Sequence, residues 1–165
     1  MLTPFQLALK RVLDHEGLYS HDPRDPGGET YKGISRRAHP TWPGWKIIDQ
    51  LKSDTPAETL RLNLVAIEGQ LQSLVEQLYE EHYWKPLFCD RSSFAMGFQV
   101  FDAGVNHGLK QARRLLSLSN GSPYRFNAER LKFYTSLKTF KTFGRGWTNR
   151  IIKNLEYASI DTGHG

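Results

Sequence analysis

Carboxylates are concentrated in one short stretch near the N-terminus, between residues 15 and 35. Prolines and glycines surround them, so the segment has the composition of a stiff loop. Turn formation explains the prolines and glycines, but it does not explain so many acids. Carboxylate-based hydrolases place an acid at the end of a helix and its partner on a nearby loop. The residues available for such chemistry are Glu16, Asp22, Asp25, Glu29 and the hydroxyl-bearing Thr30.

The first helix is predicted to carry Glu16 at the edge of an apolar face. Thr3 and Gln6 have the spacing of a capping box, and Pro4 suits the first helical position. An apolar stripe follows with helical spacing, and it comprises Phe5, Ala8, Leu9, Val12 and Leu13. Glu16 continues this stripe, so partial desolvation would raise its pKa and keep it protonated as a general acid. The alternative is an exposed glutamate at a frayed helix end, without a catalytic role.

Five segments of the chain resemble glycoside hydrolase family 108. They are residues 16–19 (EGLY), 22–30 (DPRDPGGET), 33–35 (GIS), 101–106 (FDAGVN) and 143–150 (FGRGWTNR). The family comprises N-acetylmuramidases found in phage endolysins and bacterial wall enzymes. The resemblance therefore implies a mainly α, lysozyme-like (α+β) fold, with a small β-hairpin near the active site.

The chain departs from the family pattern in two places. Leu18 stands where the family usually has a second glycine, which affects the flexibility of the loop and not the chemistry. Residues 53–78 are longer than the usual connection.

The resemblance implies that Glu16 is the general acid that protonates the glycosidic oxygen. The spacing of Glu16, Asp25 and Thr30 is similar to the Glu/Asp/Thr triad of phage-type lysozymes, with one residue fewer in the second gap. We therefore expect Asp25 to be the base or electrostatic partner, and Thr30 to position a water molecule. Asp22 and Glu29 are alternative partners, and either could instead cap a turn or brace the hairpin. A partner that activates water implies inversion at the anomeric carbon, with carboxyl groups about 6.5–9.5 Å apart.

Substrate contacts are expected from Tyr19, Asn106, Trp147 and Arg150. Residues 94–105 are apolar nearly all round and predict a buried central helix. Asp102 and Asn106 are its polar exceptions and lie one turn apart. They either bond the acetamido group of a sugar or tie neighbouring loops together, and we favour the second role for Asp102.

The charge is distributed unevenly along the chain. The net charge is +5, yet residues 1–108 carry 11 Lys and Arg against 14 Asp and Glu. Residues 109–153 carry 11 Lys and Arg and a single acid, Glu129. Such a basic segment attracts a polyanion. Its interleaved aromatic residues suit either single-stranded nucleic acid or a glycan strand with anionic peptide stems.

The predicted partners follow from this charge and from the resemblance. No helix-turn-helix, zinc-finger or ribonucleoprotein signature is present, so we expect no nucleic acid. We expect a lysozyme-like catalytic region at 1–108 and a basic helical peptidoglycan-binding region at 109–165, packed on it as one globular unit. The expected partners are the glycan strands of peptidoglycan and an anionic outer-membrane surface, and the chain is expected to be a monomer.

Several other classes of protein are not supported by the sequence. The six histidines show no metal-binding spacing, Cys89 is the single cysteine, and no Walker or dinucleotide glycine loop occurs. We therefore expect no metal and no cofactor. The sequence contains no apolar stretch long enough to span a membrane and no pattern of a signal peptide. We expect a phage endolysin that stays in the host cytoplasm until a separate pore protein releases it to the periplasm and cell wall.

Other elements are predicted from local signals. Residues 56–83 predict one long helix with a leucine stripe of coiled-coil period, begun by a capping box from Thr55 to Glu58. We expect this helix to lie along the domain, and a partner-binding or dimerising helix is the alternative. Gly144 and Gly146 predict a break before a last helix at 147–157.

The predicted activity is an N-acetylmuramidase that cleaves the β-1,4 bond between N-acetylmuramic acid and N-acetylglucosamine. A lytic transglycosylase, which uses one glutamate and leaves an anhydro sugar, is the alternative among enzymes. The alternative outside enzymes is a non-catalytic wall-binding or interaction module.

Overall fold

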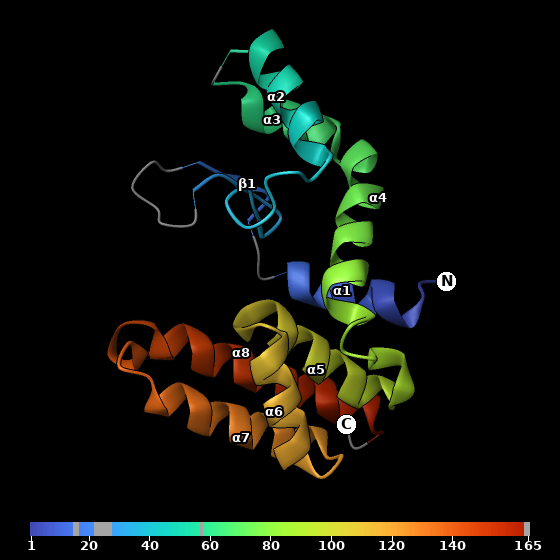
Figure 1. Ribbon diagram of the computed structural model, residues 1–165, viewed down its shortest axis with the longest axis vertical. Coiled ribbons are helices and arrows are strands. Elements are labelled where there is room, and N and C mark those ends of the chain that lie inside the picture. Colours follow the sequence, from blue (N-terminus) through green and yellow to red (C-terminus); the bar gives the residue numbers. More distant parts are fainter. Residues whose placement is uncertain (15–16, 22–27, 57, 164–165) are drawn as a thin grey trace. The chain divides into compact units, whose positions relative to one another are not determined.

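The computed structural model describes residues 1–14, 17–21, 28–56 and 58–163 (Figure 1). The predicted mainly helical fold with a small antiparallel sheet is confirmed. The chain divides into two compact units, residues 1–81 (unit 1) and 82–165 (unit 2). Unit 1 contains α1 (Pro4–Leu13), β1 (Tyr19–Ser20), β2 (Thr30–Tyr31), β3 (Ile34–Ser35), α2 (Gly44–Asp54), α3 (Leu60–Ala66) and α4 (Glu68–Tyr79).

Helix α1 begins as the sequence predicts. The backbone N–H of Gln6 donates to Thr3 Oγ1 at 3.2 Å, and that of Thr3 donates to Gln6 Oε1 at 3.1 Å. This reciprocal pair satisfies two of the orphan donors at the helix start. The buried side of the helix includes Ala8, Leu9 and Val12, so the predicted apolar stripe faces the core of unit 1.

The three strands form an antiparallel sheet in the order β1-β2-β3. A two-residue turn joins β2 to β3, and both of its residues, Lys32 and Gly33, have positive φ, at 44° and 77°. This is the pattern of a type I′ turn, which matches the twist of a hairpin. Glycine adopts this conformation freely, but a lysine does so at some energetic cost.

The predicted long helix at 56–83 is two helices. Helix α3 ends at Ala66 and α4 begins at Glu68, because Ile67 leaves helical geometry with φ −98° and ψ 7°. The expected stripe still packs inward, since Leu64, Leu71 and Leu78 are buried. A further π-helical turn, η1 (Glu80–Trp84), follows α4.

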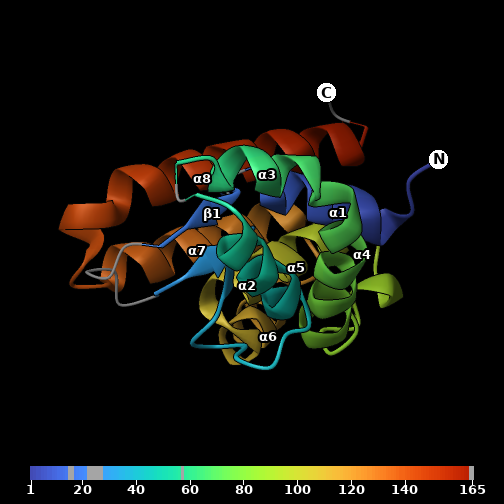
Figure 2. The same cartoon turned by 90° about the horizontal axis from the view of Figure 1, so that it is seen from above.

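The predicted capping box from Thr55 to Glu58 is wrong. Thr55 is the C-cap of α2, and its hydroxyl donates to the carbonyl oxygen of Leu51 at 2.5 Å. Helix α3 starts later, after Thr59, without a side-chain cap. Figures 1 and 2 both show α2 beside α3, on which it packs.

Unit 2 is built around the predicted buried helix. Every residue of α5 (Phe94–His107) from Ala95 to Gly104 is buried. Helix α5 packs on α6, α7 and α8, and on the short 3-10 turn η2. The surrounding elements are η2 (Cys89–Arg91), α6 (Leu109–Ser119), α7 (Pro123–Ser136) and α8 (Phe140–Asp161).

The predicted break before the last helix is wrong, because α8 runs from Phe140 to Asp161 without interruption. Gly144 lies inside the helix, and a Cβ there would stand 2.9 Å from the ring of Phe140. A glycine therefore makes room for that ring within a continuous helix. Gly146 is also helical.

The division into units falls between Glu81 and His82, whereas the sequence places a division after residue 108. Helix α5 belongs with α6, α7 and α8 because its apolar surface packs on them. The predicted separation of catalytic and peptidoglycan-binding regions concerns function, and it stays a prediction. None of the helices in the described part of the chain combines the length and apolar character that a membrane crossing needs.

Candidate functional site

Three of the predicted catalytic acids, Glu16, Asp22 and Asp25, lie outside the described residues. Their surroundings are nevertheless placed. Asp14 caps the C-terminal end of α1, two positions before Glu16, and β1 begins at Tyr19. The helix and the hairpin that flank these acids in the sequence are therefore both present in unit 1.

Thr30 lies on the central strand of the sheet. Its register partners are Ser20 on β1 and Ser35 on β3. Residues in register across antiparallel strands present their side chains on the same face. The sheet thus carries a row of three hydroxyl side chains, with Thr30 in the middle.

Glu29, the residue before Thr30, is the centre of an ion-pair cluster. We call Tyr19, Glu29, Arg36, Asp49 and Lys52 the Glu29 cluster. The Tyr19 hydroxyl donates to Glu29 Oε1 at 2.8 Å, and Lys52 Nζ donates to the same oxygen at 2.9 Å. Arg36 Nε lies 2.6 Å from Glu29 Oε2 and also donates through both terminal nitrogens to Asp49.

The electrostatics of this cluster keep Glu29 ionised. Burial alone would raise the pKa of Glu29, whose side chain is 6% exposed. The hydrogen bonds from Lys52 and Tyr19 and the charges of Lys52 and Arg36 outweigh burial, so its pKa lies below the ordinary value. Burial and the bond to Glu29 raise the pKa of Tyr19. Glu29 therefore holds β1, the hairpin and α2 together, which matches the bracing role considered for it.

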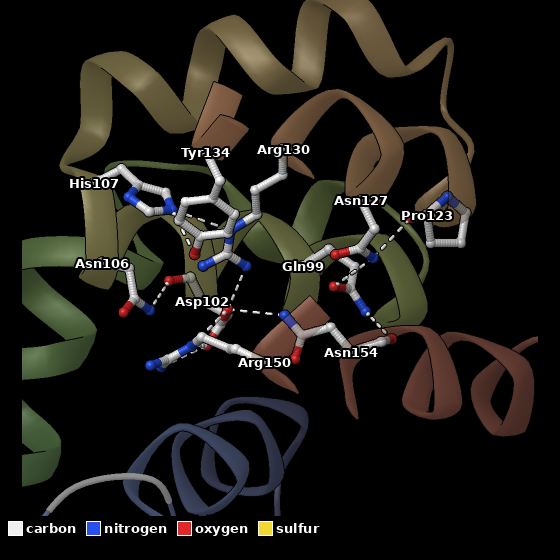
Figure 3. Close-up of polar contacts among 10 residues, drawn as sticks. All are labelled: Gln99, Asp102, Asn106, His107, Pro123, Asn127, Arg130, Tyr134, Arg150 and Asn154. Carbon is white, nitrogen blue, oxygen red and sulfur yellow. Dashed lines mark hydrogen bonds and ion pairs between the residues drawn. The ribbon is translucent and has the colours of Figure 1, made fainter. Parts of the chain in front are cut away.

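Asp102 is the centre of a second cluster, in unit 2 (Figure 3). Its side chain is 1% exposed, and it pairs with Arg130 of α7 and Arg150 of α8. Arg130 Nη1 lies 2.5 Å from Oδ2, and Arg150 Nη2 lies 2.9 Å from Oδ1. Asn154 Nδ2 donates to Oδ2 at 2.8 Å. Asp102 thus ties α5 to α7 and α8, as the favoured interpretation of this residue expects.

The charges around Asp102 determine its protonation. Burial opposes ionisation, but the charges of Arg130 and Arg150 hold the pKa of Asp102 well below its usual range. Asn106, a predicted substrate contact, donates its Nδ2 to the backbone oxygen of Asp102 at 2.7 Å. Arg150, another predicted contact, has a side chain that is 14% exposed and directed at Asp102.

His107 extends this cluster towards the aromatic residues. Arg130 Nε donates to His107 Nε2 at 3.1 Å, and the Tyr134 hydroxyl lies 3.1 Å from the same nitrogen. Burial and the charge of Arg130 lower the pKa of His107 to about 3, so the ring is neutral at neutral pH. Trp147, a predicted substrate contact, stacks on Tyr134 at 4.9 Å between ring centroids.

A buried amide chain completes the interior of unit 2. Gln99 donates to the backbone oxygen of Asn154 and accepts from Asn127, which also donates to the Pro123 carbonyl (Figure 3). Sequence reasoning missed these amides, as well as the partners Arg36, Lys52 and Arg130. The Arg and Lys residues resemble the other bases of the chain in sequence, so no local signal distinguishes them. In the described part of the chain, no three His, Cys, Asp or Glu side chains come together in a way that would hold a metal ion.

Comparison with known proteins places these features in context. A model of the glycosyl hydrolase 108 family matches residues 9–108. The solved structure of SagA from Brucella abortus is similar, with a TM-score of 0.67 and 24% sequence identity over 93% of this chain and 92% of the SagA chain. The likeness extends over both units, and the lysozyme-like, mainly helical fold class is confirmed. None of the curated proteins matches the chain.

Proposed function

The chain belongs to the glycosyl hydrolase 108 family, and from this membership we propose that it hydrolyses peptidoglycan. The bond cleaved is the β-1,4 bond between N-acetylmuramic acid and N-acetylglucosamine. The observation that carries the proposal is the family match itself. The matched residues 9–108 include the C-terminal half of α1, the acid-rich segment at 15–35 and the hairpin.

Glu16 is proposed as the general acid. It follows α1, whose capping box and buried apolar side are both present. An acid at this position can protonate the glycosidic oxygen while a partner on the loop activates water from the other side of the sugar ring.

Asp25 is proposed as that partner, with Thr30 positioning the water. The cations around Glu29 support this choice over Glu29, because a carboxylate paired with Lys52 and Arg36 is a weak base. The row of hydroxyl residues through Ser20, Thr30 and Ser35 supports a water-binding role for this face of the sheet.

The role of Glu16 is tested by the Glu16→Gln variant. We expect turbidity clearance of purified cell walls to fall by about 10²–10⁴-fold, because proton transfer to the leaving group is lost. The matched control is Glu81→Gln, which removes an exposed carboxylate elsewhere in unit 1. Full lytic activity of Glu16→Gln, with an unchanged melting temperature, would contradict the assignment.

The products distinguish hydrolysis from transglycosylation. Mass spectrometry of the digested walls should show reducing N-acetylmuramic acid ends, because water attacks the anomeric carbon. Anhydro ends would identify a lytic transglycosylase instead. Wall binding without any clearance would identify a non-catalytic module.

We further propose the biological setting expected from the sequence, a phage endolysin released to the cell wall through a separate pore protein. In this setting the basic region at 109–165 binds glycan strands and meets an anionic outer membrane. Exposed bases such as Lys110, Lys138, Lys141 and Arg145 support this role, together with the half-buried Trp147. Asn106, Tyr19 and Arg150 stay predicted substrate contacts, and the monomeric state stays a prediction.

A further inference from the structure

A pocket of about 480 Å³ opens in unit 1 among α1, α4 and the turn between β2 and β3. Leu9, Leu13 and Leu18 supply apolar surface to it. Leu13 and Leu18 lie on either side of Glu16 in the amino-acid sequence.

Glu76 of α4 presents an oriented carboxylate to this pocket. Its Oε2 accepts from Gln6 Nε2 at 3.2 Å, and its Oε1 accepts from Gln72 Nε2 at 3.0 Å. Both donors are neutral amides. Among the residues that the structure describes, no Lys, Arg or His lies within ion-pair distance of Glu76. Within the described part of the chain, the Glu76 carboxylate is therefore not neutralised by a protein cation.

Lys32 sets the orientation of Glu76 indirectly. Its Nζ lies 2.5 Å from Glu68 Oε1 and donates to Gln72 Oε1 at 2.9 Å. Because the carbonyl oxygen of Gln72 accepts from Lys32, its amide nitrogen is left to donate to Glu76. The backbone of Lys32 takes its left-handed φ of 44° here, while its carbonyl accepts from the Tyr79 hydroxyl at 2.8 Å. A lysine is uncommon at such a backbone position, and its side chain there contacts both Glu68 and Gln72.

Lys10 presents the opposite charge. It follows Gln6 by one helical turn on α1 and lines the same pocket. No carboxylate of the described residues lies within ion-pair distance of its ammonium group. Asp14 and the paired Lys32 and Glu68 also line the pocket. Within the described residues, the pocket therefore offers the Glu76 carboxylate and the Lys10 ammonium without an ion-pair partner, with leucine surface beside them.

We propose that this pocket binds the zwitterionic end of a diamino acid in the stem peptide of peptidoglycan. The ammonium of the ligand pairs with Glu76, its carboxylate pairs with Lys10, and its methylene groups lie on the leucines. The proposal rests on the proposed function for the source of the ligand. It adds a site for the peptide part of the wall beside the site for the glycan.

Isothermal titration of the full chain with a synthetic stem tetrapeptide, carrying diaminopimelate at the third position, tests this site. We expect Glu76→Gln to weaken binding about tenfold, because a charge-assisted hydrogen bond is lost. Lys10→Gln should weaken binding about two- to fivefold, since an exposed ion pair contributes less. Glu81→Gln is the matched control, since its carboxylate also accepts from one glutamine, Gln77, but does not line the pocket.

A change in the ligand provides a test that no folding defect can mimic. Acetylation of the side-chain ammonium of the tetrapeptide should weaken its binding to the wild-type chain by about the same factor as Glu76→Gln. The two changes together should cost little more than either alone. Equal affinities of the wild-type chain for the free and acetylated peptides would overturn the proposal.

The outcomes for the pocket and for the proposed function are separable. If the chain clears walls but does not bind the tetrapeptide at millimolar concentration, the peptide-binding role of the pocket is wrong and the proposed hydrolase activity stands. If the chain binds the tetrapeptide but does not clear walls, the peptide-binding role of the pocket is supported and the proposed hydrolase activity is wrong. Glu16→Gln should bind the tetrapeptide as tightly as the wild-type chain does.

Discussion

Glu29 and Asp102 are buried carboxylates that each meet two cations, and the cations decide what these acids can do. Lys52 and Arg36 pair with Glu29, while Arg130 and Arg150 pair with Asp102. Both pKa values lie below the ordinary range, so neither carboxylate holds a proton at neutral pH. Their role is to join elements, and the acid for catalysis must come from another residue.

Replacing Glu29 by Gln should therefore affect stability more than chemistry. The variant leaves Arg36 and Lys52 without their shared partner, and we expect the free energy of unfolding to fall by about 1–3 kcal/mol. Urea denaturation followed by circular dichroism measures this loss. Wall clearance below the unfolding transition should stay within a few-fold of the wild-type rate. A loss as large as that of Glu16→Gln would make Glu29 the catalytic partner in place of Asp25.

The lowered pKa of Glu29 also predicts how the free energy of unfolding depends on pH. Because the folded-state pKa of Glu29 lies below its ordinary value of 4.5, its contribution is complete above that pH and declines as the pH falls further. Unfolding free energies measured from pH 6 to pH 3 should therefore drop less for Glu29→Gln than for the wild-type chain. Parallel pH profiles of the two proteins would contradict this assignment.

The lowered pKa of His107 predicts a second dependence of the free energy of unfolding on pH, over a different pH range. Its folded-state pKa of about 3 lies below the ordinary value of 6.5, so only the unfolded chain takes up a proton between these values. Stability should fall as the pH is lowered from 6.5 towards 3, by up to about 1.4 kcal/mol per pH unit. His107→Gln keeps a hydrogen-bond acceptor and should remove this slope. His82→Gln, a substitution at an exposed position, should leave the slope in place.

At the scale of elements, α8 shows how packing overrides local helix signals. Its two glycines lie two residues apart, which locally predicts a break, yet the helix passes through both. Tyr134 of α7 stacks on Trp147, and Asp102 of α5 pairs with Arg150, so other helices hold α8 directly after this stretch. These contacts compensate for the lower helix propensity of glycine.

Alanine substitutions at Gly144 and Gly146 separate the effect of helix propensity from the effect of side-chain packing. A Cβ at Gly146 meets nothing within 4 Å, so Gly146→Ala should stabilise the chain by about 0.5–1 kcal/mol. A Cβ at Gly144 would meet the Phe140 ring at 2.9 Å, so Gly144→Ala should give no such gain. Thermal unfolding of both variants measures the difference. A melting temperature that Gly146→Ala does not raise would indicate that α8 is broken there in solution.

At the scale of the whole molecule, the two units differ in the sign of their charge. Unit 1 carries 9 Lys and Arg against 12 Asp and Glu, and unit 2 carries 13 against 5. Two of the bases in unit 2, Arg130 and Arg150, form ion pairs with Asp102. Other bases, such as Lys141, are exposed at the surface. An anionic surface should therefore attract unit 2 more than unit 1.

Vesicles that contain anionic lipid test this asymmetry. In sedimentation assays, we expect the affinity for these vesicles to fall at least about tenfold between 50 and 300 mM NaCl, because salt screens exposed charges. Lys141→Glu in unit 2 should weaken binding more than Lys46→Glu in unit 1, although both change the net charge equally. Equal effects of the two substitutions would show that only the overall charge matters.

The sequence by itself determined the elements whose signals are local. The capping box and apolar stripe of α1, the turn-rich hairpin and the apolar run of α5 all predict what the structure contains. These signals depend on residues within one or two turns of each other, so a linear pattern records them. The family motifs are local in the same sense, and the predicted roles of Glu16, Asp22 and Asp25 still depend on them alone.

Only the tertiary structure decided which charged residues meet. Lys52 reaches Glu29 across 23 positions of the chain, and Arg130 and Arg150 reach Asp102 across 28 and 48. The end of α3 before Ile67 and the continuity of α8 were also decided by packing. The physical reason is that a pair of charges depends on the distance between two side chains, and helices packed from distant parts of the sequence set that distance.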